Sequence, residues 1–249
     1  MLTRVAVLSD IHGVVPALTA VLAEPDLRDA EKIVLTGDMT AGPQPGVALD
    51  MLLELGDKVA WLGGNADREI VEFRRGRRDT IPDEIAPWAA EQLTDEHIDF
   101  LATLPRTLTF PVERLGDVLF CHATPRDDDE IVLVDSTLDR WAEVLDGVEP
   151  DTVVCGNTHM PFVRLANGKL VINPGSVGMP YGRAGAHWAL LGPGVDLRRT
   201  MFDVDKAIEA VKSCGYPGID EWSDYFLRAR ATDAEAIGAF GPKDGRRTP

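Results

Sequence analysis

Short apolar runs alternate with helical segments over the first 62 residues, and this alternation constrains the fold more than any other feature of the sequence. Residues 3–9, with the apolar core 5–8, and the apolar residues 33–35 and 59–62 are typical of buried strands. The segments between them, 14–24 and 46–55, have the periodicity of helices. The order strand, helix, strand, helix, strand predicts parallel neighbouring strands joined by right-handed crossovers.

The second half of the chain predicts a second sheet. Residues 66–105 are mostly helical and polar, but from residue 108 onward strand-like runs follow one another closely. These strand-like runs are residues 118–121, 152–155, 162–165, 170–172, 186–191 and 195–201. One predicted helix, near 136–145, lies between the first two of them. Asn167-Gly168 separates two of them and is the preferred dipeptide of a type I′ hairpin turn. We therefore expect a second sheet that packs on the first.

The chain is expected to form one domain. Its 249 residues fit a single large α/β domain, and no repeat, low-complexity stretch or linker divides them. Residues 1–240 form the predicted domain, with a C-terminal helical segment at about 203–240. This segment either lines the functional cleft or forms a dimer contact, so a homo-oligomer is one of the possible states of the protein. Residues 241–249 are predicted to form a disordered tail.

Net charge and hydropathy exclude several classes of partner. The formal charge of −16 repels phosphate backbones and anionic lipid, so we expect neither nucleic-acid nor membrane binding. No apolar run reaches the roughly 18 residues of a transmembrane helix, and the first residues carry no signal-peptide pattern. The cysteines lack paired spacing, which favours a soluble protein of the reduced cytoplasm. A small phosphorylated substrate is compatible with this charge, because bound metal ions reverse the local field.

Five short polar motifs follow predicted strands at the point where each strand ends. They are Ser9-Asp10-Ile11-His12-Gly13, Gly37-Asp38, Gly63-Gly64-Asn65-Ala66-Asp67, Cys121-His122 and Gly156-Asn157-Thr158-His159. Ligands of open α/β sheets bind beyond the carboxyl ends of the strands, so we expect these side chains to converge. Together they offer imidazole, carboxylate and amide groups, a mixture that divalent cations prefer. The sequence therefore predicts a metal site, in which Gly37, Gly64 and Gly156 let the backbone approach closely.

The order of these motifs resembles the signature of the calcineurin-like metallophosphoesterases. That signature runs Asp-x-His, Gly-Asp, Gly-Asn-x-Asp, His and Gly-x-x-His, and the match covers roughly residues 3–200. The stretches His-Ala-Thr-Pro-Arg at 122–126 and Asn-Pro-Gly-Ser-Val-Gly at 173–178 are similar to those of the small bacterial and archaeal phosphodiesterase branch. The resemblance implies an α/β fold of four layers, an αββα sandwich of two mixed β-sheets flanked by helices.

The resemblance also implies a site with two divalent ions, which would be Mn, Fe, Ni or Zn. Its metal ligands would be Asp10, His12 and His159 for one ion, Asn65, His122 and Asn157 for the other, and Asp38 as a bridge. A hydroxide shared by the ions would attack phosphorus in line, with Asp38, Asn65 and His122 as catalytic residues. Asn65 and Arg126 are the predicted substrate-binding residues. The expected activity is hydrolysis of a phosphodiester or a phosphomonoester.

Two positions depart from the family pattern. Asn157 stands where relatives usually have histidine, and an amide oxygen is a weaker and harder donor than an imidazole nitrogen. The second ion should therefore be held loosely or be of a harder type. Ala66 stands where many relatives have a histidine that protonates the leaving oxygen. Its absence favours substrates with acidic leaving groups.

Several assignments have a second interpretation. Arg126 either clamps a substrate phosphate or neutralises the carboxylates at 127–129. Asp67 is expected to cap the following helix or to support a ligand rather than bind metal itself. A nucleotide-polyphosphate or protein phosphatase on the same fold is an alternative function. From another class, a pseudoenzyme scaffold for protein–protein contact is the alternative, although such a protein should have lost several ligands.

Overall fold

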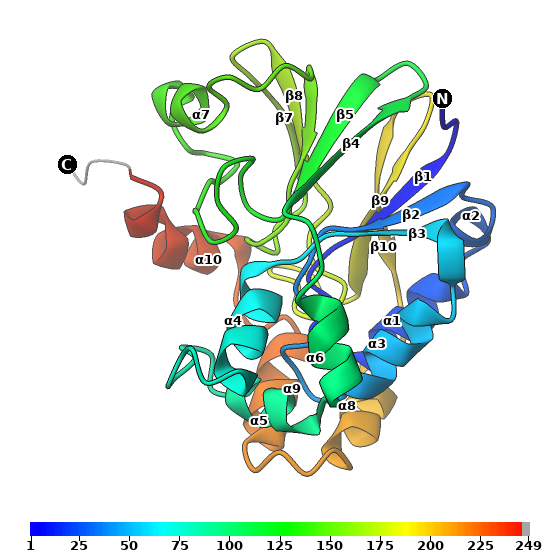
Figure 1. Cartoon of the computed structure of the whole chain (residues 1–249), viewed down its shortest axis with the longest axis vertical. Coiled ribbons are helices and arrows are strands. Elements are labelled where there is room, and N and C mark those ends of the chain that lie inside the picture. The colour runs from blue at the N-terminus through cyan, green and yellow to red at the C-terminus, as the bar shows by residue number, and fades with distance from the viewer. Residues whose placement is uncertain (246–249) are drawn as a thin grey trace.

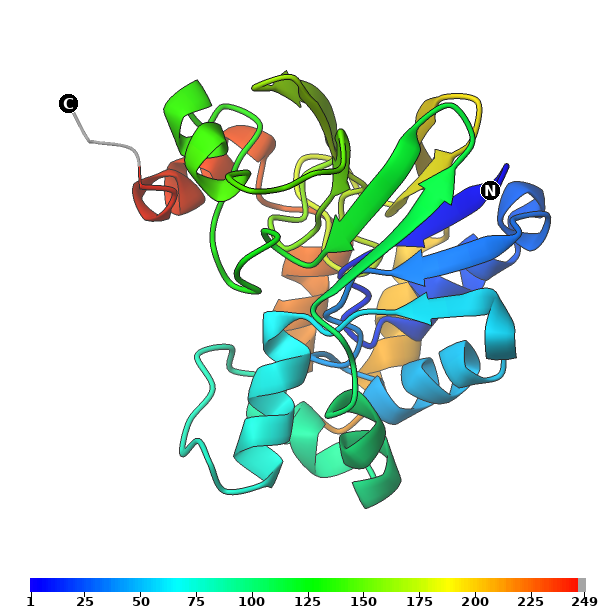
Figure 2. The same cartoon turned by 45° about the horizontal axis from the view of Figure 1, so that its top comes forward.

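Two five-stranded mixed sheets lie face to face in the computed structural model, which describes residues 1–245 (Figure 1). The first sheet has the strand order β10-β9-β1-β2-β3 and the second the order β4-β5-β6-β8-β7. The strands are β1 (Val5–Leu8), β2 (Lys32–Leu35), β3 (Val59–Trp61), β4 (Thr107–Val112), β5 (Gly116–Cys121), β6 (Thr152–Val154), β7 (Phe162–Ala166), β8 (Lys169–Asn173), β9 (Ala186–Leu191) and β10 (Val195–Thr200). Figure 2 shows the blue and cyan strands of the first sheet beside the green strands of the second.

Parallel strands form the centre of each sheet. In the first sheet β1 pairs with β2, and β2 with β3, in parallel, as the alternation of the N-terminal segments predicts. In the second sheet β5, β6 and β8 are parallel, so the carboxyl ends of these strands also meet at one edge. Antiparallel strands complete both sheets, which makes them mixed.

The hairpin predicted at Asn167-Gly168 is confirmed. Ala166 pairs with Lys169 across the turn between β7 and β8, and both turn residues have positive φ, as a type I′ turn requires. The strand β4 is present in the structure but was not among the strands predicted from the sequence. It contains Pro111, which disfavours a central strand, and β4 lies at the edge of its sheet.

Alternation along β1 explains how this strand is buried on both faces of the first sheet. Val5 and Val7 point between the sheets, where they pack with Phe120 and Ile172 of the second sheet. Their neighbours in β1 point to the opposite face and join the cluster formed with the helices. A strand buried on both faces reads as a continuous apolar run, which is why β1 is so clear in the sequence.

Helices cover the outer faces of both sheets, so the predicted four-layer α/β sandwich is confirmed. The helices are α1 (Val15–Leu22), α2 (Pro25–Arg28), α3 (Pro45–Leu53), α4 (Asn65–Arg74), α5 (Ala86–Gln92), α6 (Asp95–Leu101), α7 (Leu138–Val144), α8 (Val204–Lys212), α9 (Ile219–Leu227) and α10 (Asp233–Phe240), with the 3₁₀ turns η1 (Gly56–Lys58) and η2 (Gly241–Lys243). Most helices lie on the first sheet. On the second, Trp141 of α7 packs against Val153 and Val171.

The C-terminal segment differs from the expected tail over its first residues. Gly241–Lys243 forms η2, and Asp244 is fully buried, where its carboxylate accepts a 2.6 Å hydrogen bond from Ser136 Oγ. Residues 241–245 therefore belong to the folded body, and the remainder of the predicted tail, 246–249, lies outside the described residues. Within residues 1–245, no helix is long and apolar enough to cross a membrane.

Candidate metal centre

The predicted metal ligands come from loops at the carboxyl ends of five strands. Asp10 and His12 follow β1, Asp38 follows β2, and Asn65 follows β3 at the first position of α4. From the second sheet, His122 follows β5, and Asn157 and His159 follow β6. The structure brings these side chains together at one edge of the sandwich. Five of the seven line a cavity of about 560 Å³, namely His12, Asp38, Asn65, Asn157 and His159. Asp10 and His122 are 0% and 1% exposed beside them.

Left-handed backbone conformations are concentrated at this site. Among the non-glycine residues with positive φ are five of the predicted ligands, namely Asp10 (54°), His12 (49°), Asp38 (54°), Asn157 (65°) and His159 (59°). Residues other than glycine adopt the left-handed backbone conformation at a cost of about 1–3 kcal/mol each, and such strain persists where the surrounding structure imposes it. The strained backbone at these residues therefore lowers the stability of the fold, and it directs the five side chains towards a common point.

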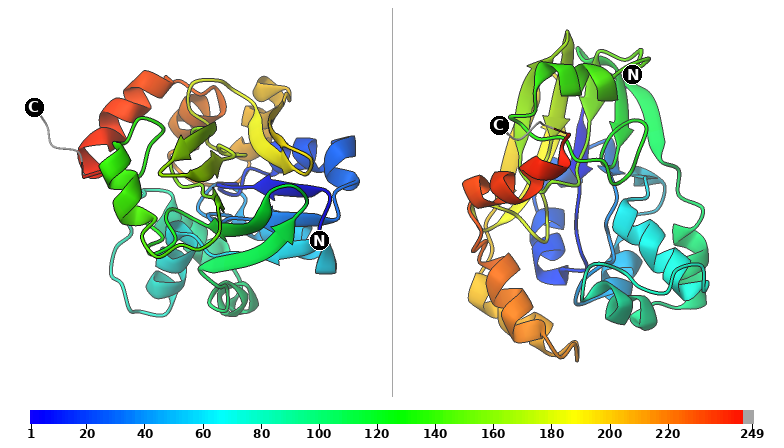
Figure 3. Two further views of the ribbon diagram at one scale, coloured as in Figure 1. Left: turned by 90° about the horizontal axis from the view of Figure 1, so that it is seen from above. Right: turned by 90° about the vertical axis from the view of Figure 1, so that its left-hand side faces the viewer.

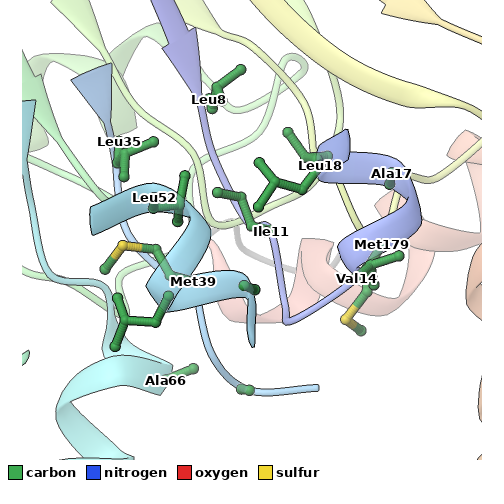
Figure 4. Close-up of a cluster of buried hydrophobic side chains, with 14 of the residues drawn as sticks. Leu8, Ile11, Val14, Ala17, Leu18, Leu35, Met39, Leu52, Ala66 and Met179 are labelled. Atoms are coloured by element: carbon green, nitrogen blue, oxygen red, sulfur yellow. The ribbon is translucent and has the colours of Figure 1, made fainter. Parts of the chain in front are cut away.

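Apolar neighbours hold the ligand loops in place. Ile11 lies between two predicted ligands, Met39 follows Asp38, and Met179 contacts the His159 loop through its carbonyl. These apolar side chains belong to one buried cluster, which Figure 4 shows between the first sheet and its helices. The loops of Asp10, Asp38 and His159 are thus each in contact with a residue whose side chain is anchored in the apolar cluster.

Asp67 ties two of the ligand loops together. Its carboxylate accepts hydrogen bonds from the backbone N–H groups of Asp38 (2.7 Å) and Met39 (3.0 Å) and from that of Gly64 (3.2 Å), which precedes α4. Burial and the nearby charge of Asp38 raise the pKa of Asp67 to about 6. The structure therefore gives Asp67 both of its expected roles, the helix cap and the support of a ligand, and the second role fixes the left-handed turn at Asp38.

All three imidazoles at the site are oriented by backbone carbonyls. The Nδ1 atoms of His12, His122 and His159 lie 2.9, 2.8 and 2.8 Å from the carbonyl oxygens of Ala41, Thr36 and Met179. A carbonyl accepts hydrogen bonds only, so each Nδ1 carries the proton. In the neutral ring the lone pair is then on Nε2, the atom that points into the site. This pattern is the usual one for histidines that bind metal.

The first group of potential ligands consists of Asp10, His12 and His159. Asp10 Oδ1 lies 3.2 Å from His159 Nε2 and 4.0 Å from His12 Nε2, and the two Nε2 atoms are 3.2 Å apart. Two lone pairs at this distance repel unless a cation or a proton lies between them. Asp10 Oδ1 is buried and accepts no hydrogen bond, and its other oxygen accepts from Ser9 Oγ at 2.5 Å. A metal ion fits these donors and would satisfy the orphaned oxygen.

The second group contains Asp10, Asp38 and His122. Asp38 Oδ2 lies 3.3 Å from His122 Nε2 and 4.0 Å from His12 Nε2, so this oxygen stands between the two groups, where a bridging ligand would be. Its other oxygen accepts the backbone N–H of Ala66 at 2.9 Å. Asn65 Oδ1 lies 3.1 Å from His122 Nε2, which adds an amide oxygen to this side.

Asn157 is at the boundary of the two groups. Its backbone N–H donates to Asp10 Oδ2 at 3.2 Å, and its side chain lines the cavity. The amide nitrogen Nδ2 is buried and has no hydrogen-bond partner among the described residues. A rotation of the amide would put Oδ1 at the place of Nδ2, as a ligand would require. Its role as a ligand of the second ion stays a prediction.

The charges of the cluster are strongly coupled. Burial opposes the charged form of His122, but Asp38 and then Asp10 raise its pKa to about 10. Burial likewise opposes ionisation of Asp10, yet the charges of His159, His122 and His12 hold the pKa of that carboxyl below its usual range. For His12, burial and the charge of His159 lower the pKa. In the metal-free protein, protons therefore occupy the positions where cations would bind.

Close backbone approach depends on glycine at Gly64 and Gly156, as expected. A Cβ atom on Gly64 would collide with the carboxylate of Asp38, and one on Gly156 would collide with Ser9 Oγ and lie 2.8 Å from Asp10 Oδ2. Side chains at either position would displace a predicted ligand. The sequence motif thus specifies the space around the carboxylates as well as the carboxylates themselves.

Arg126 lies apart from the ligand cluster. Its guanidinium contacts Glu130 at 2.5 Å and Glu143 at 2.7 Å, and it is not among the residues that line the cavity. Its carboxylate partners are therefore not those at 127–129 that the alternative interpretation named. A substrate-binding role for Arg126 stays a prediction, and it would require the guanidinium to leave these carboxylates.

Sequence reasoning missed several charged residues of the cavity wall. Glu69, Asp83, Asp129 and Lys243 all line it. They lie in α4, in two loops and in η2, at positions outside the five motifs, so no sequence signal marks them. The carbonyls that orient the histidines were also invisible, because every residue has one.

Two facing mixed sheets with Asp and His clusters at the ends of parallel strands are the arrangement of the metallophosphoesterase class. The chain belongs to the calcineurin-like phosphoesterase superfamily, because residues 3–192 match the model of that domain. This match confirms the resemblance that the motifs indicate. The family is metal-dependent, and the two groups of Asp and His side chains could hold such metal.

Similar proteins come from bacteria and archaea. The protein named "Uncharacterized protein MJ0912" from Methanocaldococcus jannaschii is 27% identical over 243 residues, covering 88% of this chain and 95% of its own. The fold is similar to that of a metallophosphoesterase from Sphaerobacter thermophilus, with a TM-score of 0.73, 23% identity and coverage of 92% of this chain and 99% of the other. It is also similar to the hypothetical protein PH1004 from Pyrococcus horikoshii OT3, with a TM-score of 0.74, 21% identity and coverage of 90% and 98%.

Proposed function

We propose that the protein is a metal-dependent phosphoesterase that hydrolyses phosphodiester or phosphomonoester bonds of a small phosphorylated substrate. The observation that carries the proposal is the position of Asp38 Oδ2, 3.3 Å from His122 Nε2 and 4.0 Å from His12 Nε2, between two groups of potential ligands. A carboxylate in this place is suited to join two cations. The family match supports hydrolase chemistry at this position.

Two bound ions would supply a water of lowered pKa as the nucleophile and positive charge for the phosphoryl oxygens. The chain contributes the arrangement of donors around them. Asp10 and Asp38 supply buried negative charge, and the three Nε2 atoms supply lone pairs whose direction is fixed by the carbonyl contacts at Nδ1. Because these donors are held by the backbone, little rearrangement is needed on binding.

Asn65 is the side chain placed to meet the substrate. It lines the cavity, its Oδ1 faces His122, and its amide nitrogen offers donors for a phosphoryl oxygen. Ala66 lines the same cavity and offers no proton to a leaving group. We infer a preference for esters whose leaving group departs without help from an acid. The cavity of about 560 Å³ leaves room for a leaving group much larger than a phosphate.

Metal content and turnover together test the proposal. The protein would be stripped with a chelator, reloaded with Mn, Fe, Ni or Zn, and assayed with bis(p-nitrophenyl) phosphate and p-nitrophenyl phosphate. At least one metal should restore hydrolysis. Asp38→Asn should lower turnover by at least about 10³-fold, whereas Asp139→Asn, a control on the exposed face of α7, should behave as wild type.

Other outcomes would favour the alternative functions. Metal binding without hydrolysis of any phosphoester would indicate a pseudoenzyme scaffold. Hydrolysis restricted to nucleoside polyphosphates or to phosphoproteins would move the substrate class to one of the alternative phosphatases. Full activity of Asp38→Asn would contradict the bridging role.

A further inference from the structure

The end of the described chain returns to the metal centre. We define the C-terminal arm as residues 232–245, which comprise α10 and η2 and lie beyond the 3–192 segment matched by the family model. Phe240 and Lys243 of this arm line the same cavity as His12 and His159. Figures 1 and 3 show the arm, in red, beside the green helix α7.

Two sets of contacts fix the arm in this place. On its apolar side, Ala236 packs with Ile131, Leu133 and Met160 in a buried cluster. Beyond Phe240, Asp244 is fully buried and accepts the 2.6 Å hydrogen bond from Ser136 Oγ. Lys243 lies between these anchors, so its backbone position is determined on both sides.

An aromatic contact links the arm to a predicted ligand. Phe240 meets Tyr181 edge to face at 5.9 Å, and Tyr181 stacks on the ring of His159 at 5.7 Å. The arm therefore packs directly behind the metal centre. Of the two uses that the sequence left open for the C-terminal segment, the structure gives residues 232–245 a place in the cleft wall.

Lys243 differs from the other charged residues of the cavity wall that have ion-pair partners. Glu69 pairs with Arg78 at 3.2 Å, and Glu130 pairs with both Arg126 and Arg140. Lys243, by contrast, forms no ion pair with any residue in the described part of the chain, although the chain has a net charge of −16. An unpaired ammonium group in the wall of such a cavity is available to an anionic group of a ligand.

The other walls restrict where that anionic group can bind. Asp83 and Asp129 line the cavity and form no ion pair with the described residues. Two negative walls would repel a second anionic group of the substrate, whereas the metal centre and Lys243 would attract one. The metal centre and Lys243 are therefore the parts of this cavity wall that attract anionic groups.

We infer that Lys243 is a specificity-determining residue that binds a second phosphate group of the substrate, beyond the scissile phosphorus. The inference rests on the proposed function and names its substrate class: phosphoesters that carry a further phosphate. Lys243 takes no part in the bond cleavage itself. Its contribution is selective affinity for the doubly anionic substrate.

A pair of chromogenic substrates tests this inference. Thymidine 5′-(p-nitrophenyl phosphate) and the same compound with a 3′-phosphate share one leaving group and differ only in the second phosphate. Wild type should favour the 3′-phosphorylated substrate in kcat/KM by about fivefold to tenfold, the range expected for a charge-assisted contact at a solvated site. Lys243→Ala should abolish this ratio, Lys243→Glu should invert it, and Lys243→Arg should retain most of it.

Lys206→Ala is the matched control, because Lys206 lies on α8, pairs with Asp203 at 3.2 Å and does not line the cavity. It should leave the substrate ratio unchanged. Calorimetric binding of thymidine 3′,5′-bisphosphate and thymidine 5′-phosphate to the metal-loaded protein gives a second reading that does not depend on turnover. Lys243→Ala should reduce the advantage of the bisphosphate by the same factor.

The outcomes separate this inference from the proposed function. If wild type hydrolyses both substrates and Lys243→Ala leaves their ratio unchanged, the inference is overturned while the proposed function stands. If wild type hydrolyses neither of them, and neither bis(p-nitrophenyl) phosphate nor p-nitrophenyl phosphate, the proposed function is overturned and binding decides the role of Lys243. Bisphosphate binding that weakens in Lys243→Ala would then support recognition by this residue, and binding independent of it would refute the inference.

Discussion

The substitution Asp38→Asn has an effect in the metal-free protein that follows directly from the geometry. In wild type, Asp38 Oδ2 lies 3.3 Å from His122 Nε2, and the pKa of His122 is raised to about 10 from its usual 6.5. Burial acts in the opposite direction, and Asp38 is the largest cause of the increase. Asp38→Asn removes this charge, and the new amide can donate to a neutral Nε2. The pKa of His122 should then fall to or below its usual value.

The pKa difference sets the size of the stability effect. A histidine with a raised pKa stabilises the folded state fully below pH 6.5, and this stabilisation is lost as the pH rises towards 10. At about 1.36 kcal/mol per pH unit, deprotonation of His122 should lower the free energy of unfolding by about 3 kcal/mol between pH 6.5 and 9. The decrease should reach about 5 kcal/mol between pH 6.5 and 10. Asp38→Asn should remove this dependence.

Urea unfolding of chelator-treated protein at pH 6.5, 7.5 and 9 measures the effect. The difference in slope between wild type and Asp38→Asn isolates the histidine from groups that titrate in both, and Asp139→Asn controls for the loss of one carboxylate. Nuclear magnetic resonance of the His122 ring gives the protonation state directly. A ring still protonated at pH 8 in Asp38→Asn, or equal slopes of the two proteins, would refute the electrostatic coupling.

Three further predictions concern the metal centre. Because His122 and His159 have raised pKa values, metal binding should release protons. The metal affinity should therefore rise by up to roughly tenfold per pH unit for each proton released. Calorimetry in two buffers measures the proton release, and a metal affinity that does not change with pH would contradict the prediction. Asn157→His should strengthen binding of the weaker ion by at least about tenfold, and an unchanged weaker dissociation constant in a metal titration would show that Asn157 is not a ligand. A p-nitrophenyl ester should be cleaved far faster than an alkyl ester, and Ala66→His should narrow this gap by up to about 10²–10⁴. Equal rates for both esters in wild type would indicate another acid, with Tyr181 the first residue to test.

The elements predicted from sequence are those whose signals are local. The strands β1 and β2 are buried on both faces, so their apolar runs are continuous, and the hairpin at Asn167-Gly168 needs only two adjacent residues. The convergence of the motifs could be expected because parallel strands end at one edge. By contrast, β4 contains a proline that the edge position tolerates, and edge position is a property of the whole sheet.

The parts of the site that sequence did not reveal depend on contacts distant along the chain. Lys243 lines the cavity beside Asp244, which accepts a hydrogen bond from Ser136, 108 positions away. The sequence left two possible partners for the Arg126 guanidinium, a substrate phosphate and the neighbouring aspartates. In the structure, one of its partners is Glu143 of α7. Asp67 could be assigned a cap from its position, whereas its contact with the Asp38 backbone required the fold of both loops.

The origin of the ligands in two sheets has a consequence for the newly made chain. The Nε2 atoms of His12 and His159 are 3.2 Å apart in space and 147 positions apart in sequence. At a synthesis rate of about 5–20 residues per second, roughly 7–30 seconds separate their appearance at the ribosome. During this interval the N-terminal half presents Asp10, His12 and Asp38 without their partners from the second sheet. Uptake of metal would therefore require that β5 and β6 have docked, and in the cell it would report that the two sheets have come together.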